Sequence, residues 1–349
     1  MAEWWTVRVT DRRGVAVHGG GELPQIKSGS LEWSIFKPVG GSGSLEFDED
    51  AELDIDWYSS WLQVRHHSDE SGTEQIRPFG LWMPVLRQWE HHWPRRSATV
   101  ELFDACELLN WPCGQWYSAG TTRTVVEMVR EILDRFDAMH SIVDSSAVLT
   151  TPLAFEPEAT WLKIVNDLLA AIGYGAVRAG LDGVLTAGPY LAPERRLDRA
   201  AYGADQLPMK PTFSDEAPIW DAPNVVTVYS PATDTTPALL GTARNDDPAS
   251  PLSTVHRGER RLVEAHELAS QTVADQTAAR RLREASQITR RVTWRHPLDE
   301  TWLDDMVTLE PLDGERVAIV QRSINLTIGA VVETTGRRIY TGGEAPTWA

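Results

Sequence analysis

The sequence contains few cysteines, few lysines and no long apolar run. Cys106 and Cys113 are the only cysteines among 349 residues, and lysine occurs at only four positions. The first residues, MAEWWTVRVTDRRG, carry charges of both signs and lack the apolar core of a signal peptide. We therefore expect the chain to be made and folded in a cytoplasm, where both thiols stay reduced. No run of 18 apolar residues occurs, so no membrane span is predicted.

Motifs of known enzyme chemistry are missing as well. The chain has no GxSxG, HExxH, paired CxxC or phosphate-loop sequence. Gly40-Gly41-Ser42-Gly43 lacks the lysine and the following helix of a phosphate loop, so we interpret it as a turn or hairpin tip. Six residues separate the two cysteines, and no second pair completes a zinc set. We predict no catalytic, cofactor-binding or metal-binding residues, and no enzymatic activity.

Two histidine pairs are the sequence features that most resemble a metal-binding motif. His66-His67 is followed by Asp69 and Glu70, and His91-His92 forms a second pair. Neighbouring side chains on a strand point to opposite faces, so neither pair chelates one ion. We interpret both pairs as loop or surface polarity.

Acidic residues dominate the charge, which is −17 at pH 7. This balance argues against nucleic-acid binding, which needs a basic surface. It is typical of a solvated surface or of a channel wall that repels phosphate. The stretch Asp48-Glu49-Asp50, with Asp54 and Asp56, lacks the glycine and closing glutamate of a calcium loop, so we interpret it as a solvated connection. Two carboxylates for sugar hydrolysis stay open as a hypothesis, but nothing in the sequence selects a pair.

Alternation of apolar and polar residues predicts two blocks of β-strands, one at each end of the chain. In residues 290–339, apolar side chains alternate around Val292, Val307, Val317 and Ile324, with an Asp313-Gly314 hairpin signal and a further break at Gly329. Residues 30–104 show a similar layout after a short strand at 5–9, with strands at 45–47, 53–57 and 62–64 and a break centred on Gly80.

The middle of the chain reads as two helices and a hairpin. Thr124 and Glu127 form a capping box before an apolar face that runs to Phe136. A second helix begins near Pro157 and ends at Gly173, and Asp182-Gly183 is the turn of the hairpin that follows it.

The last third begins with a proline-rich connection at 208–223. A strand over 224–230, a long exposed loop over 231–251 and one long, weakly amphipathic helix over about 262–288 follow. The fold class is therefore α+β and predominantly β, with two tube-like β-barrel or β-sheet domains flanking a small mixed α+β module. The predicted boundaries are 1–105 for the first β-domain, 106–215 for the mixed module and 216–349 for the second β-domain.

This order of elements, together with a few local patterns, resembles a known family. The patterns are Ala159–Leu169 running to Gly173-Tyr174, the Leu181–Leu185 hairpin, the Asn224–Val228 strand, the helix from Glu264 to Ile288, Pro297-Leu298 and Trp302–Val307. Over nearly the whole chain, it resembles the tail-tip hub proteins of bacteriophages: the baseplate hub of contractile tails, the minor tail proteins of siphophages and the spike base of type VI secretion.

The resemblance implies a structural virion protein and no catalytic residues. It implies a homotrimer at the distal tip of a phage tail, which presents six similar β-domains and so joins a six-fold tail tube to a three-fold tip. The implied partners are a distal tail ring, the tail tube or tape measure protein and other tip or fibre proteins. DNA would pass through the acidic lumen without sequence-specific contacts. The location would be the virion, after assembly in the host cytoplasm.

Two other classes of function stay open at this point. The first is a carbohydrate- or receptor-binding baseplate protein that uses exposed tryptophans such as Trp82, Trp89 or Trp93. The second is a cell-wall hydrolase, which needs a concave site and a carboxylate of raised pKa. The departure from some hub proteins is that the 349 residues contain no hydrolase module and no extended fibre region.

Overall fold

The structure is a computed structural model of the chain, and its fold is α+β and predominantly β, as predicted. It describes residues 3–17, 21–23, 26–48, 55–70, 73–92, 95–203, 207–210, 214–216, 222–232, 237–250, 252–266, 268, 270–286 and 291–338. Within these residues no sheet closes into a barrel. None of the described helices combines the length and the apolar character needed to cross a membrane.

One 12-stranded sheet carries both β-blocks. Its N-terminal strands are β1 (Glu3–Thr10), β2 (Ile26–Ser34), β3 (Gly41–Asp48), β4 (Trp61–Glu70), β5 (Thr73–His92) and β6 (Arg95–Phe103). Its C-terminal strands are β17 (Arg291–Pro297), β18 (Met306–Leu309), β19 (Glu315–Asn325) and β20 (Val331–Arg338). The two remaining strands are β12 (Asp198–Tyr202) and β13 (Ser214–Glu216).

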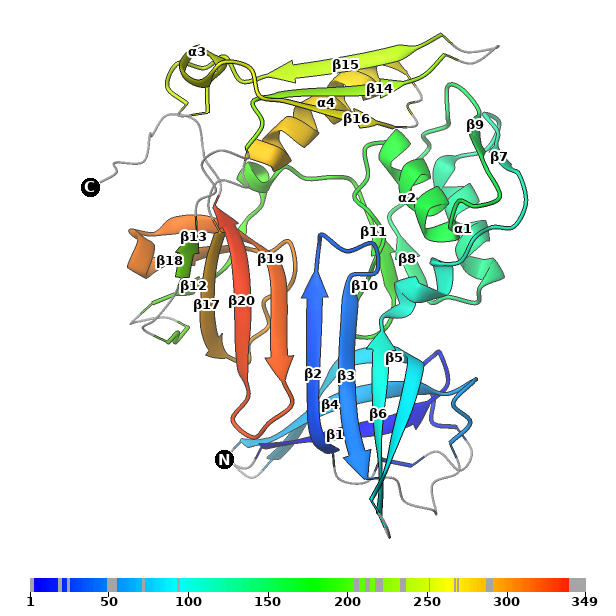
Figure 1. Cartoon of the computed structure of the whole chain (residues 1–349), viewed down its shortest axis with the longest axis vertical. Helices are drawn as coiled ribbons and strands as arrows, with labels where there is room; N and C mark the ends of the chain where they lie inside the picture. Colours follow the sequence, from blue (N-terminus) through cyan, green and yellow to red (C-terminus); the bar gives the residue numbers. More distant parts are fainter. Residues whose placement is uncertain are drawn as a thin grey trace.

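The two blocks meet edge to edge at the centre of this sheet. β2 pairs antiparallel with β19, with Leu31 opposite Ile324 (Figure 1). Leu326 and Val332 of the C-terminal block belong to the same buried cluster as Leu31 and Leu45. The blocks therefore share part of one core, because apolar side chains of adjacent strands lie on the same face of a continuous sheet.

The predicted turns of the C-terminal block are confirmed. Asp313 and Gly314 have φ values of 55° and 75° between β18 and β19, after the short 3₁₀ helix η4 (Glu310–Leu312). Gly329, with a φ of 68°, lies in the turn between β19 and β20. Aspartate and glycine adopt these left-handed conformations more readily than other residues do.

Two predictions in the N-terminal block are wrong. Gly80 is not a break between strands but lies inside the 20-residue strand β5, with a φ of 111°. A Cβ at this position would lie 2.3 Å from Nε1 of Trp82, so glycine allows the indole to fold over the strand. The chain at Ile55 and Trp57 is a loop and turn rather than a strand, and Leu53 lies outside the described residues. The strand register shifts near Gly80, where β5 bends.

The two helices of the middle region are confirmed. Helix α1 (Val125–Arg135) has the capping box between Thr124 and Glu127, and α2 (Trp161–Ala171) is capped by Thr160. The second helix thus begins one turn later than Pro157, because the Thr160 side chain accepts a hydrogen bond from the Lys163 N–H. Gly173 follows its end with a φ of 76°.

Short strands surround these helices at the right of Figure 1. They are β7 (Tyr117–Ala119), β8 (His140–Ile142), β9 (Leu153–Phe155), β10 (Arg178–Ala179) and β11 (Leu185–Ala187), with the 3₁₀ helices η1 (Ala105–Leu109) and η2 (Pro193–Arg195) at the two ends. β10 and β11 form the predicted hairpin, and Gly183 in its turn has a φ of 79°. A separate apolar core lies between the helices and these strands.

Strands β12 and β13 fall within the predicted range of the mixed module, yet they pair with β18 and β17 of the C-terminal block. An ion-pair junction lies nearby, since Asp304 contacts both Arg178 and Arg196. The Arg196 guanidinium also donates to the Asp304 carbonyl at 2.8 Å. The three domain boundaries themselves stay a prediction.

The region after the proline-rich connection forms a small separate unit, at the top of Figure 1. Strand β14 (Val225–Ser230) lies between β15 (Leu239–Arg244) and β16 (Arg261–Ala265), and α4 (Gln271–Ser286) packs on one face. A single turn of helix, α3 (Thr254–Arg257), precedes β16. We call this group of elements, residues 222–286, the small unit.

Two predictions for the small unit are wrong. The loop expected over 231–251 contains β15, and the first part of the helix expected over 262–288 is β16. Residues 261–265 pair parallel with β14, and Leu262 packs toward α4 while Val263 is exposed. Strand pairing thus overrides a weak helical pattern in which small residues carry most of the apolar face. The helix itself begins after Ser270, whose hydroxyl accepts from the Val273 N–H.

Candidate functional site

The first histidine pair is buried within strand β4, so its interpretation as loop or surface polarity is wrong. His66 and His67 are buried neighbours on β4 and contact different side chains. The His66 ring lies 4.7 Å from that of Trp5, and burial lowers its pKa. His67 instead places Nδ1 2.7 Å from Oε1 of Glu74 and Nε2 2.8 Å from the Thr6 hydroxyl. No group of three or more His, Cys, Asp or Glu residues converges within the described ranges.

The other predicted clusters remain dispersed where they are described. Asp69 is exposed, whereas the side chains of Glu70, His91 and His92 lie outside the described part, as do Glu49, Asp50 and Asp54. Asp48 pairs with Lys27 at 2.7 Å. Asp56 accepts from the Tyr58 N–H and the Ser59 hydroxyl of its own turn. These two carboxylates serve local contacts.

The glycine-rich stretch is only partly a turn. Gly40 lies in the connection after β2, but Gly41, Ser42 and Gly43 belong to β3. A Cβ on Gly41 would lie 2.9 Å from Oδ2 of Asp104, and one on Gly43 would lie 2.6 Å from the Ser30 carbonyl oxygen. Close packing of strands, rather than a phosphate cradle, accounts for these glycines.

Neither cysteine forms a disulfide. Cys106 and Cys113 are both free, as predicted, and Cys106 is buried. Burial and the neighbouring Asp104 raise the pKa of the Cys106 thiol, so it stays protonated and inert.

The carbohydrate-binding alternative named three tryptophans as exposed, and the structure describes two of them. Trp82 is 1 % exposed and belongs to the core, so its predicted exposure is wrong. Trp89 is 41 % exposed, but the Arg87 guanidinium lies 3.7 Å from its ring centroid. Trp93 lies outside the described residues.

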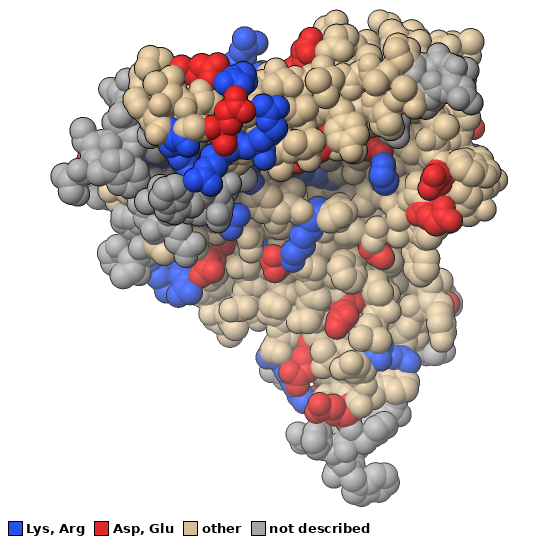
Figure 2. Space-filling model, turned by 45° about the horizontal axis from the view of Figure 1, so that its top comes forward, with Lys and Arg blue, Asp and Glu red and all other residues tan. Residues whose placement is uncertain are grey.

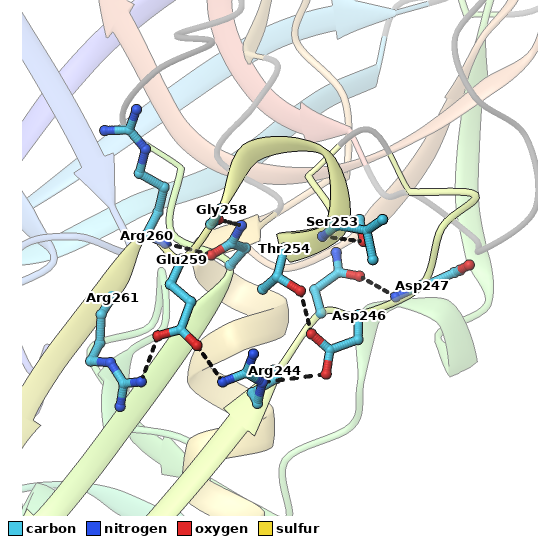
Figure 3. Close-up of polar contacts among 12 residues, drawn as sticks. Arg244, Asp246, Asp247, Ser253, Thr254, Gly258, Glu259, Arg260 and Arg261 are labelled. Atoms are coloured by element: carbon cyan, nitrogen blue, oxygen red, sulfur yellow. Dashed lines mark hydrogen bonds and ion pairs between the residues drawn. The ribbon is translucent and has the colours of Figure 1, made fainter.

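A charged cluster that the sequence reasoning missed lies beside α3 in the small unit. We call it the α3 cluster, made of Arg244, Asp246, Thr254, Glu259 and Arg261 (Figure 3). Glu259 accepts from Arg244 at 2.6 Å through one oxygen and from Arg261 at 2.9 Å through the other. Arg244 also donates to Asp246 at 3.3 Å, and the Thr254 hydroxyl donates to the same carboxylate. Two arginines and two carboxylates thus alternate across the ends of β15 and β16.

The buried side chain of Asn224 holds the backbone under this cluster. Its amide oxygen accepts from the Arg260 N–H at 2.7 Å, and its NH₂ group donates to the Gly258 carbonyl at 2.8 Å. Asn245 similarly donates to the Ser250 hydroxyl at 2.8 Å. Because each loop is tied to the start of β14, the arrangement of charges is fixed before any partner binds.

Hydrogen bonding keeps the acids of the α3 cluster charged. The Arg261 and Arg244 guanidinium groups lower the pKa of Glu259, and the Thr254 hydroxyl, then Arg244, lower that of Asp246. These groups are exposed, so solvent screening leaves their pairing with little effect on stability. The arrangement is therefore better suited to recognition than to holding the fold together.

Charge is distributed unevenly between the small unit and the rest of the chain. Residues 222–286 contain seven arginines and eight acidic residues, a net charge of −1, so the rest carries −16. In Figure 2, Lys and Arg side chains gather at the upper left, where α3 lies, and are more scattered elsewhere on this face. Arginine in a fixed position binds carboxylates or phosphates well, because its planar fork matches their oxygens.

The face of the small unit's sheet that does not contact α4 carries exposed apolar side chains. Val226 and Val228 pack under α4, whereas Leu240 and Val263 are 58 % and 55 % exposed. Tyr229, opposite Leu240 in the strand register, is partly exposed as well. An apolar surface next to ordered charges is a common composition for protein interfaces.

A second charged group, in contrast, is buried in the C-terminal block. We call it the Asp299 network, made of Tyr202, His296, Asp299, Thr301 and Arg322. Asp299 lies 3.0 Å from Nδ1 of His296, accepts from the Thr301 hydroxyl at 2.7 Å and from Arg322 at 3.2 Å, and also accepts from the Tyr202 hydroxyl. Burial opposes ionisation of Asp299, but these contacts outweigh it and hold its pKa well below the usual value.

The neighbours of Asp299 respond in the expected directions. Burial and the charge of Asp299 raise the pKa of Tyr202, which therefore stays a neutral donor. Burial lowers the pKa of Arg322, although Asp299 opposes this shift. Each polar group of the network faces another group of the network, so it acts as a structural element of the core.

Comparisons with known proteins identify this architecture. No protein-family model matches the sequence, and no curated protein matches it. Among solved structures, the tail protein from Neisseria meningitidis MC58 is similar, with 13 % identity and a TM-score of 0.66 over 96 % of both chains. The 43 kDa tail protein of prophage MuSo2 from Shewanella oneidensis has 10 % identity and a TM-score of 0.63, covering 95 % of this chain and 98 % of that one. The chain has the fold of phage tail proteins.

Two further structures extend this likeness. The prophage tail protein gp18 from Listeria monocytogenes EGD-e has 15 % identity and a TM-score of 0.58, over 95 % of this chain and 94 % of that one. A chain of the Francisella PdpA–VgrG complex has 9 % identity and a TM-score of 0.57, and the match covers 99 % of this chain but 54 % of that one. The tail-protein fold therefore includes both β-blocks and the middle module, in agreement with the resemblance seen in the sequence.

Proposed function

We propose that the protein is a structural component of a phage tail, a trimeric hub at its distal tip. The observation that carries this proposal is the continuous sheet in which β2 and β19 join the two β-blocks. One chain thus contributes two β-blocks side by side, and three chains contribute six. Such a ring matches a six-fold tube on one side and a three-fold tip on the other.

The small unit is suited to contacts with other tail proteins. It projects from the long sheet at the top of Figure 1 and carries the α3 cluster next to the sheet face with exposed apolar side chains. Its proposed partners are the distal tail ring, the tail tube or tape measure protein and other tip or fibre proteins. The acidic remainder of the chain supports a DNA exit channel whose wall repels phosphate. The proposed role also implies assembly in the host cytoplasm before incorporation into the virion.

The role that we propose is architectural rather than catalytic. Its test is the mass of the purified full chain by light scattering, with negative-stain images of the same sample. We expect three times the mass of one chain and ring-shaped particles with three-fold symmetry. A chain that stays monomeric over a wide concentration range, alone and with purified tail-tube and distal-ring proteins, would contradict the proposal.

A further inference from the structure

A groove of about 1120 Å³ lies on the N-terminal block, away from the small unit. The turn after β1, the loop at 55–61, the middle of β5 and the end of α1 form its walls. Ligand sites commonly have volumes of roughly 300–1,000 Å³. The groove is therefore large enough for an oligomeric ligand rather than a single small ring.

Arg87 is an arginine of this groove whose donors are not used by any residue that the structure describes. Its guanidinium carbon lies 3.7 Å from the ring centroid of Trp89 and 5.0 Å from that of Trp57. Trp57 is itself stacked on Phe47, with 6.0 Å between ring centroids. No described residue forms a hydrogen bond or an ion pair with Arg87. The two rings thus hold the guanidinium in place by cation–π contacts, and its N–H groups remain open to an anion among the described residues.

The other arginines of the groove are already paired. Arg12 and Arg13 both contact Asp137, which follows α1, and Arg12 also donates to the Phe136 carbonyl at 3.0 Å. These contacts connect the turn after β1 to the end of α1 and close one side of the groove. Two arginines thus share one carboxylate, whereas Arg87 is the groove arginine that has no ion pair with a described residue.

The loop that carries Trp57 also presents a second aromatic ring, that of Tyr58, at the groove. Asp56 orders this loop by accepting from the Tyr58 N–H at 3.1 Å and from the Ser59 hydroxyl at 2.6 Å, and hydrogen bonding from Ser59 lowers its pKa. The ordered turn leaves Tyr58 fully exposed. A phenol ring with both faces in water provides an apolar surface for the C–H face of a sugar ring, and a hydroxyl for its polar edge.

We propose that this groove binds an anionic saccharide, an oligomer whose sugar rings carry carboxylate or phosphate groups. Arg87 binds the anionic group, and Tyr58 stacks on a ring of the ligand. Nucleic acid also combines rings with phosphates, but it is a long polyanion, and the −17 charge of the chain repels it. A short acidic oligomer contacts only the part of the surface around Arg87. This inference goes beyond the structural role, and it stands or falls independently of the trimer.

The test is isothermal titration calorimetry on the full chain, with trigalacturonic acid as the carboxylate probe. A glycerol phosphate oligomer bearing glucose serves as the phosphate probe. Comparison of the two probes shows whether the groove binds a carboxylate or a phosphate. Maltotriose and inorganic phosphate are the neutral and the sugar-free controls. We expect at least one acidic oligomer to bind, with an affinity that falls as salt rises, and both controls to bind at least tenfold more weakly.

Variants connect the binding to the groove. Arg87→Gln is expected to weaken binding of the acidic oligomer at least tenfold, Arg87→Lys less, and Tyr58→Ala several-fold. Arg123→Gln is the matched control, because Arg123 is an exposed arginine of the α1 region that pairs with Glu131, outside the groove. Thermal unfolding of each variant checks that the fold is retained.

Three results would overturn the inference. The first is equal affinity for maltotriose or for inorganic phosphate, and the second is unchanged affinity in Arg87→Gln. The third is a failure of both acidic oligomers to bind. If Arg87→Gln then changes the mass in light scattering, the groove is a protein interface instead. A wild-type chain that stays monomeric alone and with the tail-tube and distal-ring proteins, yet binds the acidic oligomer through Arg87, would contradict the trimer but support this site.

Discussion

The N-terminal and C-terminal β-blocks have similar alternating sequences but different interiors. The N-terminal block is filled by aromatic side chains such as Trp33, Phe47 and Trp82. The C-terminal block also has apolar strands, but its interior holds the Asp299 network, with the side chains of Asp299 and Arg322 8 % and 5 % exposed. The two blocks are therefore stabilised by different means within one sheet.

This difference determines how much stability each block loses when one buried side chain is replaced. Apolar burial is non-directional, so a lost side chain costs its transfer free energy and the cavity it leaves. A buried ion pair has offsetting desolvation and Coulomb terms, so the intact pair adds little, but removing one member leaves an unpaired buried charge. The C-terminal block is thus the more sensitive of the two to a single polar substitution.

The largest effect is expected from Asp299→Ala. The substitution leaves the Arg322 guanidinium buried without its carboxylate, and it removes the acceptor of Tyr202 and Thr301. We expect a loss of about 4–5 kcal/mol in the free energy of unfolding, measured by urea denaturation. The double variant Asp299→Ala/Arg322→Met should recover part of this loss, because it removes the unpaired charge. A double variant no more stable than the single one would show that packing, not charge, explains the effect.

The next effect is expected from Trp82→Ala in the N-terminal block. It removes the indole that lies over Gly80 and donates to the Phe79 carbonyl at 3.0 Å. We expect a loss of about 3–4 kcal/mol in the free energy of unfolding. Trp111→Ala is the matched control, since Trp111 is 63 % exposed, and it should change stability by less than about 1 kcal/mol. Equal losses in the two variants would contradict an aromatic core.

The smallest effect is expected from pH, because Asp104 and Asp299 make the stability of the fold depend on pH in opposite directions. Asp104 lies where β6 meets η1, and burial raises its pKa to about 6, although it accepts from the Cys106 and Gly41 N–H groups. The folded state then binds a proton more readily than the unfolded state, so stability is lost as pH rises from about 4 to about 6, by at most roughly 3 kcal/mol. Asp299 has a lowered pKa, so its contribution is present above pH 4 and is lost as pH falls below it.

Asp104→Asn separates these two contributions. Urea denaturation of the wild type and of this variant at pH 4.5, 6 and 7.5 should show the wild type losing its relative advantage as pH rises. The amide gives up one acceptor oxygen, so the variant is expected to be the less stable protein at pH 4.5. Parallel pH profiles of the two proteins would mean that Asp104 does not titrate in this range.

Local rules predicted the elements whose signals lie close together in the chain. The capping box of Thr124 and Glu127 places the start of α1, because both partners are three residues apart. The Asp313-Gly314 turn was found for the same reason. The resemblance to phage tail hub proteins led to the fold that the solved tail proteins share, even though the three tail proteins compared above are only 10–15 % identical to the chain.

The predictions that were wrong depend on partners far away in the sequence. β16 is a strand because β14, some 36 residues earlier, supplies its hydrogen bonds, as the pairing of Val225 with Arg261 shows. The α3 cluster combines Arg244 with Glu259, and the groove combines Tyr58 with Arg87. None of these residues has a distinctive spacing, so no local pattern could have selected them.

The sequence by itself determined the predominance of strands, the two middle helices, the unpaired cysteines and the strong negative charge. These properties follow from composition and from periods of two or 3.6 residues, which act over a few neighbours. Only the tertiary structure decided that the two β-blocks share one sheet, that Asp299 and Arg322 meet in a core and that Arg87 faces a groove. Such pairings depend on the register of strands hundreds of residues apart, where alternation specifies which face is buried but not which strand lies alongside.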